Sequence, residues 1–189
     1  ASNNLNRVLF TQGEELLVCD NKGALTKLNR QRILKTFNAS VRKEGELLAF
    51  DESNARTYVA FGDLYALDAN LNPTSRIVGN FKDLAIDSSG NVLAASSVFK
   101  WQFNVSDNGQ LKQLYREQPA DKARLLSIWL DGNSNEGRLT SSNLYFNESP
   151  LREIEIAQNP AICWNKKEDV FLYCNTDSML ILNNGKVNG

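Results

Sequence analysis

The stretch from Asp83 to Leu114, DLAIDSSGNVLAASSVFKWQFNVSDNGQLKQL, decides the fold class of this chain. It opens with a short apolar run, Leu84 to Asp87, that ends on an acid. The residues Ser88 to Gly90 then form a turn, because glycine takes positive φ without strain and Asp and Ser bond nearby backbone amides. Asn91 to Ala95 returns as a second strand, so this half of the stretch predicts a β-hairpin.

The second half of the stretch adds two more strands. Val98 to Phe103 is a third run, in which apolar and polar residues alternate from Phe99 onward, as in a strand with one buried face. Asp107 to Gly109 is the next turn, and Gln110 to Leu114 is the fourth strand. Four short antiparallel strands in fewer than about forty residues are typical of one blade of a β-propeller.

Weaker copies of this unit surround the clear one. They cover Arg7 to Leu28, Leu47 to Val78, Ser127 to Ile156 and Ala161 to Val187. In the first copy the innermost strand is missing from the pattern, and Gln31 to Phe37 is either a helical turn or an outer strand. We therefore predict an all-β, propeller-like fold of about five four-stranded repeats with incomplete end blades, in a single domain over residues 1–189.

The two end units leave three arrangements open. The chain closes as a small five-bladed ring, or belongs to a longer propeller, or receives its missing strands from a partner. Exposed strand edges favour strand addition, so we hypothesise that an end blade is completed in trans. The residues expected to contact a partner at the two ends are Val8, Leu9, Phe10, Leu180 and Leu182.

Composition restricts the function classes. The formal net charge of -1 provides no overall field to attract nucleic acid or anionic membrane, so we expect no nucleic-acid partner. No apolar run approaches the roughly 20 residues of a membrane-spanning helix. The absence of histidine excludes Ser/His and Cys/His nucleophile pairs. We expect no cofactor, and without a CxxC motif a zinc site is not expected either.

One column of polar residues recurs where the first strand of a unit meets its turn. Its members are Asp51, Asp87, Asp131 and Asn165. A row of acids suggests a metal site. The favoured interpretation is the Asx-turn, in which Asp or Asn bonds the backbone of its own turn, because each repeated hairpin needs one such residue.

The cysteines and the tryptophans each allow two interpretations. Cys163 and Cys174 lie on adjacent predicted strands, but Cys163 should face a residue near Leu172, so a disulfide would need a slipped register; buried thiols are the alternative. Trp101, like the other two tryptophans, falls on a predicted strand. Such aromatics usually fill the space between blades, but Trp101 is also our candidate for a partner contact.

Two short stretches resemble known propeller repeats. Gly62 to Ala69, GDLYALDA, resembles the repeats of PQQ-like propellers, and Leu84 to Leu93, LAIDSSGNVL, resembles NHL or SMP-30-type repeats. The resemblance implies a blade hairpin and says nothing of activity. SMP-30-type hydrolases hold a divalent metal with side chains that converge on the central channel, and no matching set of residues maps onto this chain.

The function favoured by these patterns is a non-catalytic protein-interaction or assembly domain. Its affinity would come from blade edges and from the loops at one rim, with a protein partner or self-association. The alternative is an extracytoplasmic sensory or small-ligand-binding domain. A metal-dependent hydrolase of the SMP-30 type is a third reading.

Overall fold

The computed structural model is built from strands. It describes residues 5–11, 15–20, 22–30, 32–40, 47–118, 123–130, 135–141, 143–147, 149–153, 161–165, 170–174, 179–183 and 186–188. Every regular element in these ranges is a β-strand. Within the same ranges, no helix has the length and hydropathy needed to cross a membrane.

The strands form five four-stranded sheets, each following the order of the chain. Neighbouring strands within a sheet are antiparallel, as expected when short hairpin turns connect them. The first sheet contains β1 (Leu5–Phe10), β2 (Leu16–Asp20), β3 (Ala24–Leu28) and β4 (Ile33–Asn38). The second contains β5 (Leu47–Asp51), β6 (Arg56–Phe61), β7 (Asp63–Leu67) and β8 (Pro73–Ile77).

The remaining three sheets repeat this order. The third contains β9 (Asp83–Ile86), β10 (Val92–Ala95), β11 (Lys100–Val105) and β12 (Leu111–Glu117). The fourth contains β13 (Leu125–Leu130), β14 (Glu136–Thr140), β15 (Asn143–Phe146) and β16 (Ser149–Glu153). The fifth contains β17 (Ala161–Asn165), β18 (Val170–Cys174), β19 (Met179–Asn183) and β20 (Lys186–Asn188).

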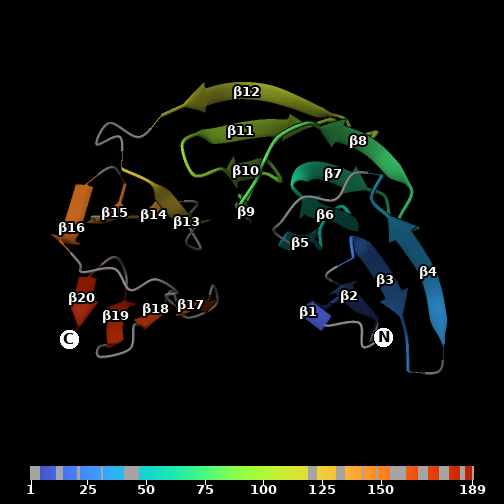
Figure 1. The fold of residues 1–189 in the computed structure, drawn as a ribbon, viewed down its shortest axis with the longest axis horizontal. Helices are drawn as coiled ribbons and strands as arrows, with labels where there is room; N and C mark the ends of the chain where they lie inside the picture. The colour runs from blue at the N-terminus through green and yellow to red at the C-terminus, as the bar shows by residue number, and fades with distance from the viewer. Residues whose placement is uncertain are drawn as a thin grey trace.

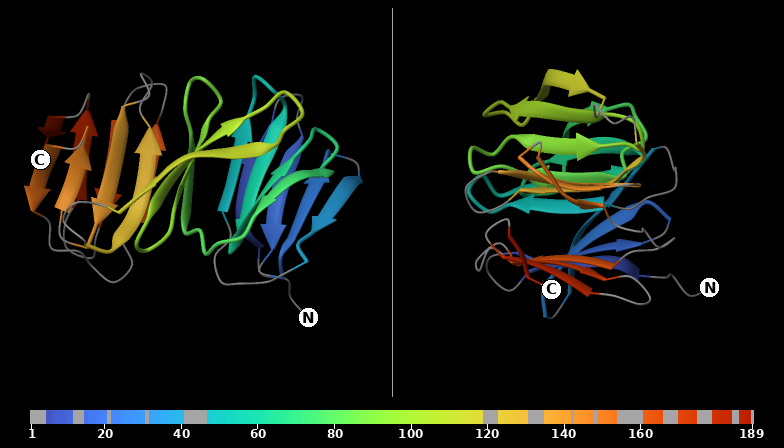
Figure 2. Two further views of the ribbon diagram at one scale, coloured as in Figure 1. Left: turned by 90° about the horizontal axis from the view of Figure 1, so that it is seen from above. Right: turned by 90° about the vertical axis from the view of Figure 1, so that its left-hand side faces the viewer.

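The five sheets follow one another around an arc (Figure 1). The first strand of each sheet lies toward the inside of the arc and the fourth lies outside, and β1, β5, β9 and β13 contact one another in sequence. The strands run between two rims, where the turns gather (Figure 2). One rim carries the turns between the first and second strands of each sheet, which we call the first-turn rim.

The hydrophobic core lies between successive sheets. Leu17, Cys19 and Leu25 of the first sheet pack with Val59 and Leu67 of the second. The opposite face of the second sheet packs on the third through a cluster that holds Tyr58, Ala60, Leu64, Phe81, Val92, Ala94 and Phe103. A smaller cluster joins Leu93 and Ala95 of the third sheet to Leu125, Ile128 and Leu130 of the fourth. A sheet covered on both faces explains the fully buried strand β7.

The segments that lead from one sheet to the next form an equivalent backbone hydrogen bond after each of the first three sheets. After its outer strand, the chain returns past the turn between the second and third strands of the sheet that it leaves. There, Ala39 N donates to Gly23 O (2.9 Å), Phe81 N to Gly62 O (2.9 Å) and Leu125 N to Ser97 O (3.0 Å). The repeat seen in the sequence therefore extends to the links between its copies.

The predicted all-β, propeller-like fold of about five four-stranded repeats is confirmed, but the expected incomplete end blades are wrong. The first sheet has four strands because β1 is its innermost strand and Gln31 to Phe37, left open between helix and strand, largely forms β4. The fifth sheet has four strands because β20 pairs with β19. Strand completion of an end blade in trans therefore loses its premise.

The outer strands of the first four sheets each carry a β-bulge. The unpaired extra residues are Leu34, Thr74, Leu114 and Leu151, each skipped in the register with the third strand. A bulge bends the strand and interrupts the row of backbone groups that an added strand would pair with. These four edges are thus poor templates for strand addition, and we look for binding at the rims.

Candidate functional site

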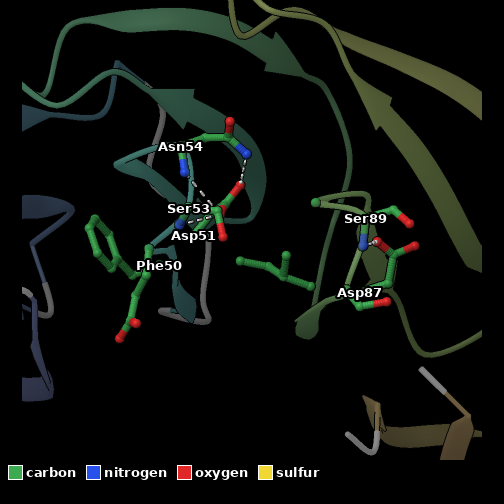
Figure 3. A pocket seen from close by; sticks show the side chains of 10 residues that line it. Phe50, Asp51, Ser53, Asn54, Asp87 and Ser89 are labelled. Carbon is green, nitrogen blue, oxygen red and sulfur yellow. Dashed lines mark hydrogen bonds between the residues drawn. The ribbon is translucent and has the colours of Figure 1, made fainter. Parts of the chain in front are cut away.

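A pocket of about 770 Å³ opens on the first-turn rim between the second and third sheets. Its walls are two equivalent segments, Phe50–Asn54 at the end of β5 and Ile86–Gly90 at the end of β9, each with the turn that follows. Figure 3 shows the two turns facing each other across the hollow. Equivalent turns of neighbouring repeats lie side by side in this fold, so residues far apart in sequence share one site.

The first wall is ordered by Asp51. Its Oδ1 accepts hydrogen bonds from the backbone amides of Ser53 (3.0 Å) and Asn54 (3.3 Å), and its Oδ2 accepts one from Asn54 Nδ2 (2.8 Å). Asp51 itself is buried. The carboxylate therefore fixes the turn, while Glu52, Ser53 and Asn54 remain exposed on it.

Asp87 orders the second wall in the same way. Its Oδ1 accepts hydrogen bonds from the amides of Ser89 (2.9 Å) and Asn91 (2.8 Å), and its Oδ2 accepts one from Asn91 Nδ2 (2.8 Å). The Asx-turn interpretation of the acid column is confirmed for Asp51 and Asp87. Asp131 lies outside the described residues, as does the side chain of Asn165.

Gly90 lets the two turns approach each other. Its φ of +80° lies in the left-handed region. A Cβ at this position would also lie 3.3 Å from Asp51 Oδ2 and 3.4 Å from Asn54 Nδ2. Glycine is therefore needed here both for the turn and for the close packing of the pocket walls.

A smaller hollow of about 100 Å³ lies on the same rim between the first and second sheets. It shares Phe50 and Glu52 with the larger pocket. Lys27 lines it, forms an ion pair with Glu15 and donates to the carbonyl of Ala69 (3.1 Å). The two hollows make a polar surface along the rim of the first three sheets.

Polar side chains make up most of the exposed pocket lining. The exposed groups of the pocket are the carboxylate of Glu52, the hydroxyls of Ser53, Ser88 and Ser89, and the amide of Asn54. They offer hydrogen bonds to a bound molecule, and the carboxylates of Asp51, Glu52 and Asp87 make the lining negatively charged. In the part of the chain that the structure describes, no three His, Cys, Asp or Glu side chains gather as a metal site.

The predicted end contacts lie on strands. Val8 of β1 is 52% exposed, while its neighbour Leu9 packs against the core between the first and second sheets. Phe10 is on β1, and Leu180 and Leu182 are on β19, but these three side chains lie outside the described residues. The pocket lining comes from other residues, so these positions stay predictions.

Trp101 packs as expected of a core aromatic, and its contact with a partner stays a prediction. On β11, it is half-buried and packs against the core between the second and third sheets. Its ring meets Phe81 edge to face at a centroid distance of 5.1 Å. The Arg116 guanidinium lies 5.4 Å from its centroid, from the solvent-exposed strand β12. Trp129 on β13 is buried, as expected of a core aromatic.

The predicted offset of the cysteines is confirmed. Cys163 pairs with Leu172 across β17 and β18, and Cys174 pairs with Ala161. The two cysteines are thus not register partners, and their side chains lie outside the described residues. Cys19 is buried in the core between the first and second sheets.

The pocket itself was missed at the level of sequence. A signal existed, because Asp51 and Asp87 were recognised as equivalent turn positions. What local pattern could not provide was that the turns face each other across a hollow, which depends on the packing of whole sheets. Polar residues in a turn are also typical of any solvent-exposed loop, so they do not by themselves indicate a pocket.

Comparisons with known proteins support the fold. The Raptor protein of Chaetomium thermophilum superposes with a TM-score of 0.75 at 12% identity, over 98% of this chain and 20% of Raptor. A Lactobacillus plantarum protein gives 0.76 at 14% identity, over 100% of this chain and 70% of that one. A Bacteroides caccae protein of unknown function gives 0.63 at 14%, over 98% and 80%.

At these identities the likeness shows the fold alone. No family model matches the chain, and no curated protein matches it. The chain covers only about one fifth of the Raptor chain. Fold and site together define the class as an all-β, propeller-like domain with a polar pocket on one rim.

Proposed function

We propose that this chain is a protein-interaction domain that binds its partner at the first-turn rim. The observation that carries the proposal is the pocket between two turns that are already fixed by their own hydrogen bonds. A preformed site loses little conformational entropy on binding. Exposed loops on a rigid scaffold are also where binding sites concentrate.

The role is proposed as non-catalytic because the carboxylates of Asp51 and Asp87 already accept hydrogen bonds from the backbone of their own turns. Asp51 and Asp87 each accept three hydrogen bonds inside their turns, two from backbone amides. A carboxylate whose oxygens accept these hydrogen bonds has a structural task in holding its own turn. We also propose that residues 1–189 act as one domain, supported by the cores shared between successive sheets.

Two matched variants test the rim. Ser89→Arg places a long cation on the pocket wall, and Asn70→Arg places one at the corresponding position of the turn that begins at Asp68, which is on the same rim but outside the pocket lining. Each residue donates its amide to the Asp two positions earlier, at 2.9 Å and 2.8 Å. A partner purified with the wild-type chain should be retained by Asn70→Arg and lost by Ser89→Arg. Equal retention by both variants would exclude the pocket as the binding site.

Self-association through the first sheet is the second part of the proposal. Val8 pairs with Val18, and the neighbouring Leu9 and Leu17 pack toward the second sheet, so the two valines face away from it. Val18 is already buried, so the apolar surface that a second copy of the chain could cover on this face is that of Val8, which is 52% exposed. Val8→Lys should then lower the mass in solution measured by light scattering, whereas Val78→Lys, at a 74% exposed valine elsewhere, should not. A wild-type monomer at high concentration would exclude self-association.

A small-ligand sensor is the second candidate function, favoured by the pocket volume. About 770 Å³ lies within the range of roughly 300–1,000 Å³ that is usual for small-molecule sites. A ligand that binds only the folded chain would raise its melting temperature. A small molecule that stabilises the wild type and Asn70→Arg, but not Ser89→Arg, would select the sensor over the interaction domain.

A further inference from the structure

A second surface, on the opposite rim from the pocket, has the chemistry of a binding site for acidic peptides. It is formed by Phe99, Trp101 and Arg116, which we call the aromatic–arginine surface. The Arg116 Cζ lies 3.7 Å from the ring centroid of Phe99 and 5.4 Å from that of Trp101. The two ring centroids are 5.9 Å apart. A guanidinium thus lies over two aromatic rings.

The backbone holds this arrangement in place. Trp101 and Arg116 are register partners across β11 and β12. Phe99 ends a tight turn in which Ser96 Oγ accepts hydrogen bonds from the amides of Val98 (3.2 Å) and Phe99 (3.1 Å). Ser96 N also donates to Phe99 O (2.8 Å). The rings are therefore presented by a hairpin and not by a free loop.

The surface also rests on the core. Trp101 packs edge to face on Phe81, which is buried between the second and third sheets. Its indole can thus support a ligand without first becoming ordered. Preorganised aromatic anchors of this kind are frequent in binding hot spots.

Arg116 has hydrogen-bonding capacity left over. Among the described residues, none forms a hydrogen bond or ion pair with its guanidinium, and the residue is solvent-exposed. Stacking uses the face of the guanidinium and leaves the N–H groups at its edge for a partner. The planar fork of Arg matches a carboxylate, with which it forms two parallel charge-assisted hydrogen bonds.

Two apolar residues close in sequence to this surface are exposed to solvent. Val98, next to Phe99, is 46% exposed, and Leu114, the bulge residue two positions before Arg116, is 54% exposed. Exposed apolar residues around an anchored charge favour a partner with a carboxylate beside aliphatic or aromatic side chains. A nucleic acid is a poorer match, because it requires several cations for its phosphates and the net charge of the chain is -1.

We propose that the aromatic–arginine surface docks an acidic peptide segment of a partner protein, in which a Glu or Asp side chain lies next to apolar residues. The carboxylate would pair with Arg116, and its apolar neighbours would cover Val98, Phe99 and Leu114. This surface is separate from the pocket, because Phe99 belongs to the turn between β10 and β11 whereas the pocket turn joins β9 to β10. Antiparallel strands place these two turns at opposite rims.

Fluorescence polarisation with a defined probe tests the proposal. The probe is a fluorescein-labelled peptide in which glutamates alternate with leucine and phenylalanine, and its control replaces every glutamate with glutamine. Wild type should bind the acidic peptide more tightly than the glutamine peptide. Arg116→Met keeps an unbranched apolar chain over Phe99, and we expect its affinity for the acidic peptide to fall about tenfold or more.

Lys112→Met is the matched control, because it removes one positive charge from the other end of the same exposed strand, opposite Asn104. It should change the affinity by less than about twofold, the scale of a screened surface charge. An equal loss of affinity in both variants would mean that the peptide responds only to the net charge of the chain, and this would overturn the proposal. Equal binding of both peptides, binding of neither, or displacement by a single-stranded oligonucleotide would overturn it too.

Discussion

The ammonium of Lys100 on β11 lies 2.8 Å from both carboxylate oxygens of Glu136 on β14, so an ion pair joins the third sheet to the fourth. Glu117 on β12 completes the group at 2.7 Å from the same nitrogen. Nearby, Asp83 Oδ2 accepts a hydrogen bond from Ile128 N (2.9 Å) across the same boundary. The interface between these sheets thus combines a small apolar cluster with charged contacts, whereas the preceding two boundaries hold larger apolar clusters.

Replacing Lys100 with methionine should destabilise the fold. The lysine side chain is 4% exposed and that of Glu136 is 18% exposed, so the variant leaves a largely buried carboxylate without its cation. We expect a loss of about 2–3 kcal/mol in the free energy of unfolding, slightly below a fully buried pair because water reaches Glu136. Urea unfolding at neutral pH measures it.

Glu117→Gln is the control for this pair. Its side chain is 47% exposed, so solvent screens its attraction to Lys100. We expect the change to cost less than about 1 kcal/mol. If Glu117→Gln destabilised the chain as much as Lys100→Met, the link to Glu136 would not be the contact that holds the sheets together.

The pH dependence of stability should show the pKa shifts of Lys100 and Tyr58. Burial lowers the pKa of Lys100, but hydrogen bonds to Glu117 and Glu136 outweigh it and raise the pKa above its ordinary 10.5. Burial, followed by the Asp51 carboxylate, raises the pKa of Tyr58 to about 12 from 10.0. Both groups hold their protons more tightly when folded, so stability is retained at neutral pH and falls as pH rises above about 10.

Tyr58→Phe separates the tyrosine from the lysine in this pH range. The Tyr58 hydroxyl is buried and forms no hydrogen bond of ordinary geometry with the described residues, although the Arg56 side chain interacts with it. Its removal should leave neutral-pH stability unchanged or raise it by about 1 kcal/mol. It should also reduce the loss of stability between about pH 10 and 12, measured by urea unfolding at each pH.

Tyr65→Phe is the matched variant in the neighbouring interface. Tyr65 is also buried, but its hydroxyl lies 3.4 Å from Ser40 Oγ. Its loss should lower stability by up to about 1 kcal/mol. A decrease for Tyr58→Phe as large as that for Tyr65→Phe would mean that the Tyr58 hydroxyl has a partner after all.

Local sequence predicted the hairpins well because their signals are local. Asp87 and Gly90 define a turn by their own chemistry, and the register of β9, β10 and β11 follows from the short connections. The outer strands were harder to read. In β4, bulged Leu34 shifts the alternation, and Ile33 is 67% exposed, so an apolar residue there did not mark the buried face.

The candidate sites depended on tertiary packing to a greater degree. Trp101 was recognised as an aromatic on a strand, but its contact with Arg116 depends on the register of β11 with β12. The pocket walls come from two repeats, and only the packing of their sheets places Phe50 and Ile86 in one lining. Sequence periodicity identifies a single repeat unit. The pockets between units depend on how all of their side chains pack.

Gly137→Ala should destabilise the fourth sheet. A Cβ at Gly137 would lie 1.9 Å from Cε2 of Trp129, its register partner on β13. The indole ring covers the glycine and would have to move out of a buried position. We expect a cost of about 1–3 kcal/mol, as for other overpacked cores, measured by thermal or urea unfolding.

A double-mutant cycle with Trp129→Leu isolates this contact. Once the indole is absent, adding the methyl group at Gly137 should cost much less than in the wild-type background. Equal costs in the two backgrounds would mean that Gly137 is needed for its backbone and not for the ring that covers it.

The last prediction separates the structural role of Asp87 from a metal-binding role. Asp87→Ala removes three hydrogen bonds from the turn and should lower stability by about 1–3 kcal/mol, whereas Asp87→Asn keeps an acceptor oxygen and should cost less. Calcium should leave the melting temperature of the wild type unchanged, because the carboxylate is already saturated by its turn. A rise with calcium that Asp87→Asn abolishes would instead assign Asp87 to a metal site, since a ligand that binds only the folded state stabilises it by mass action.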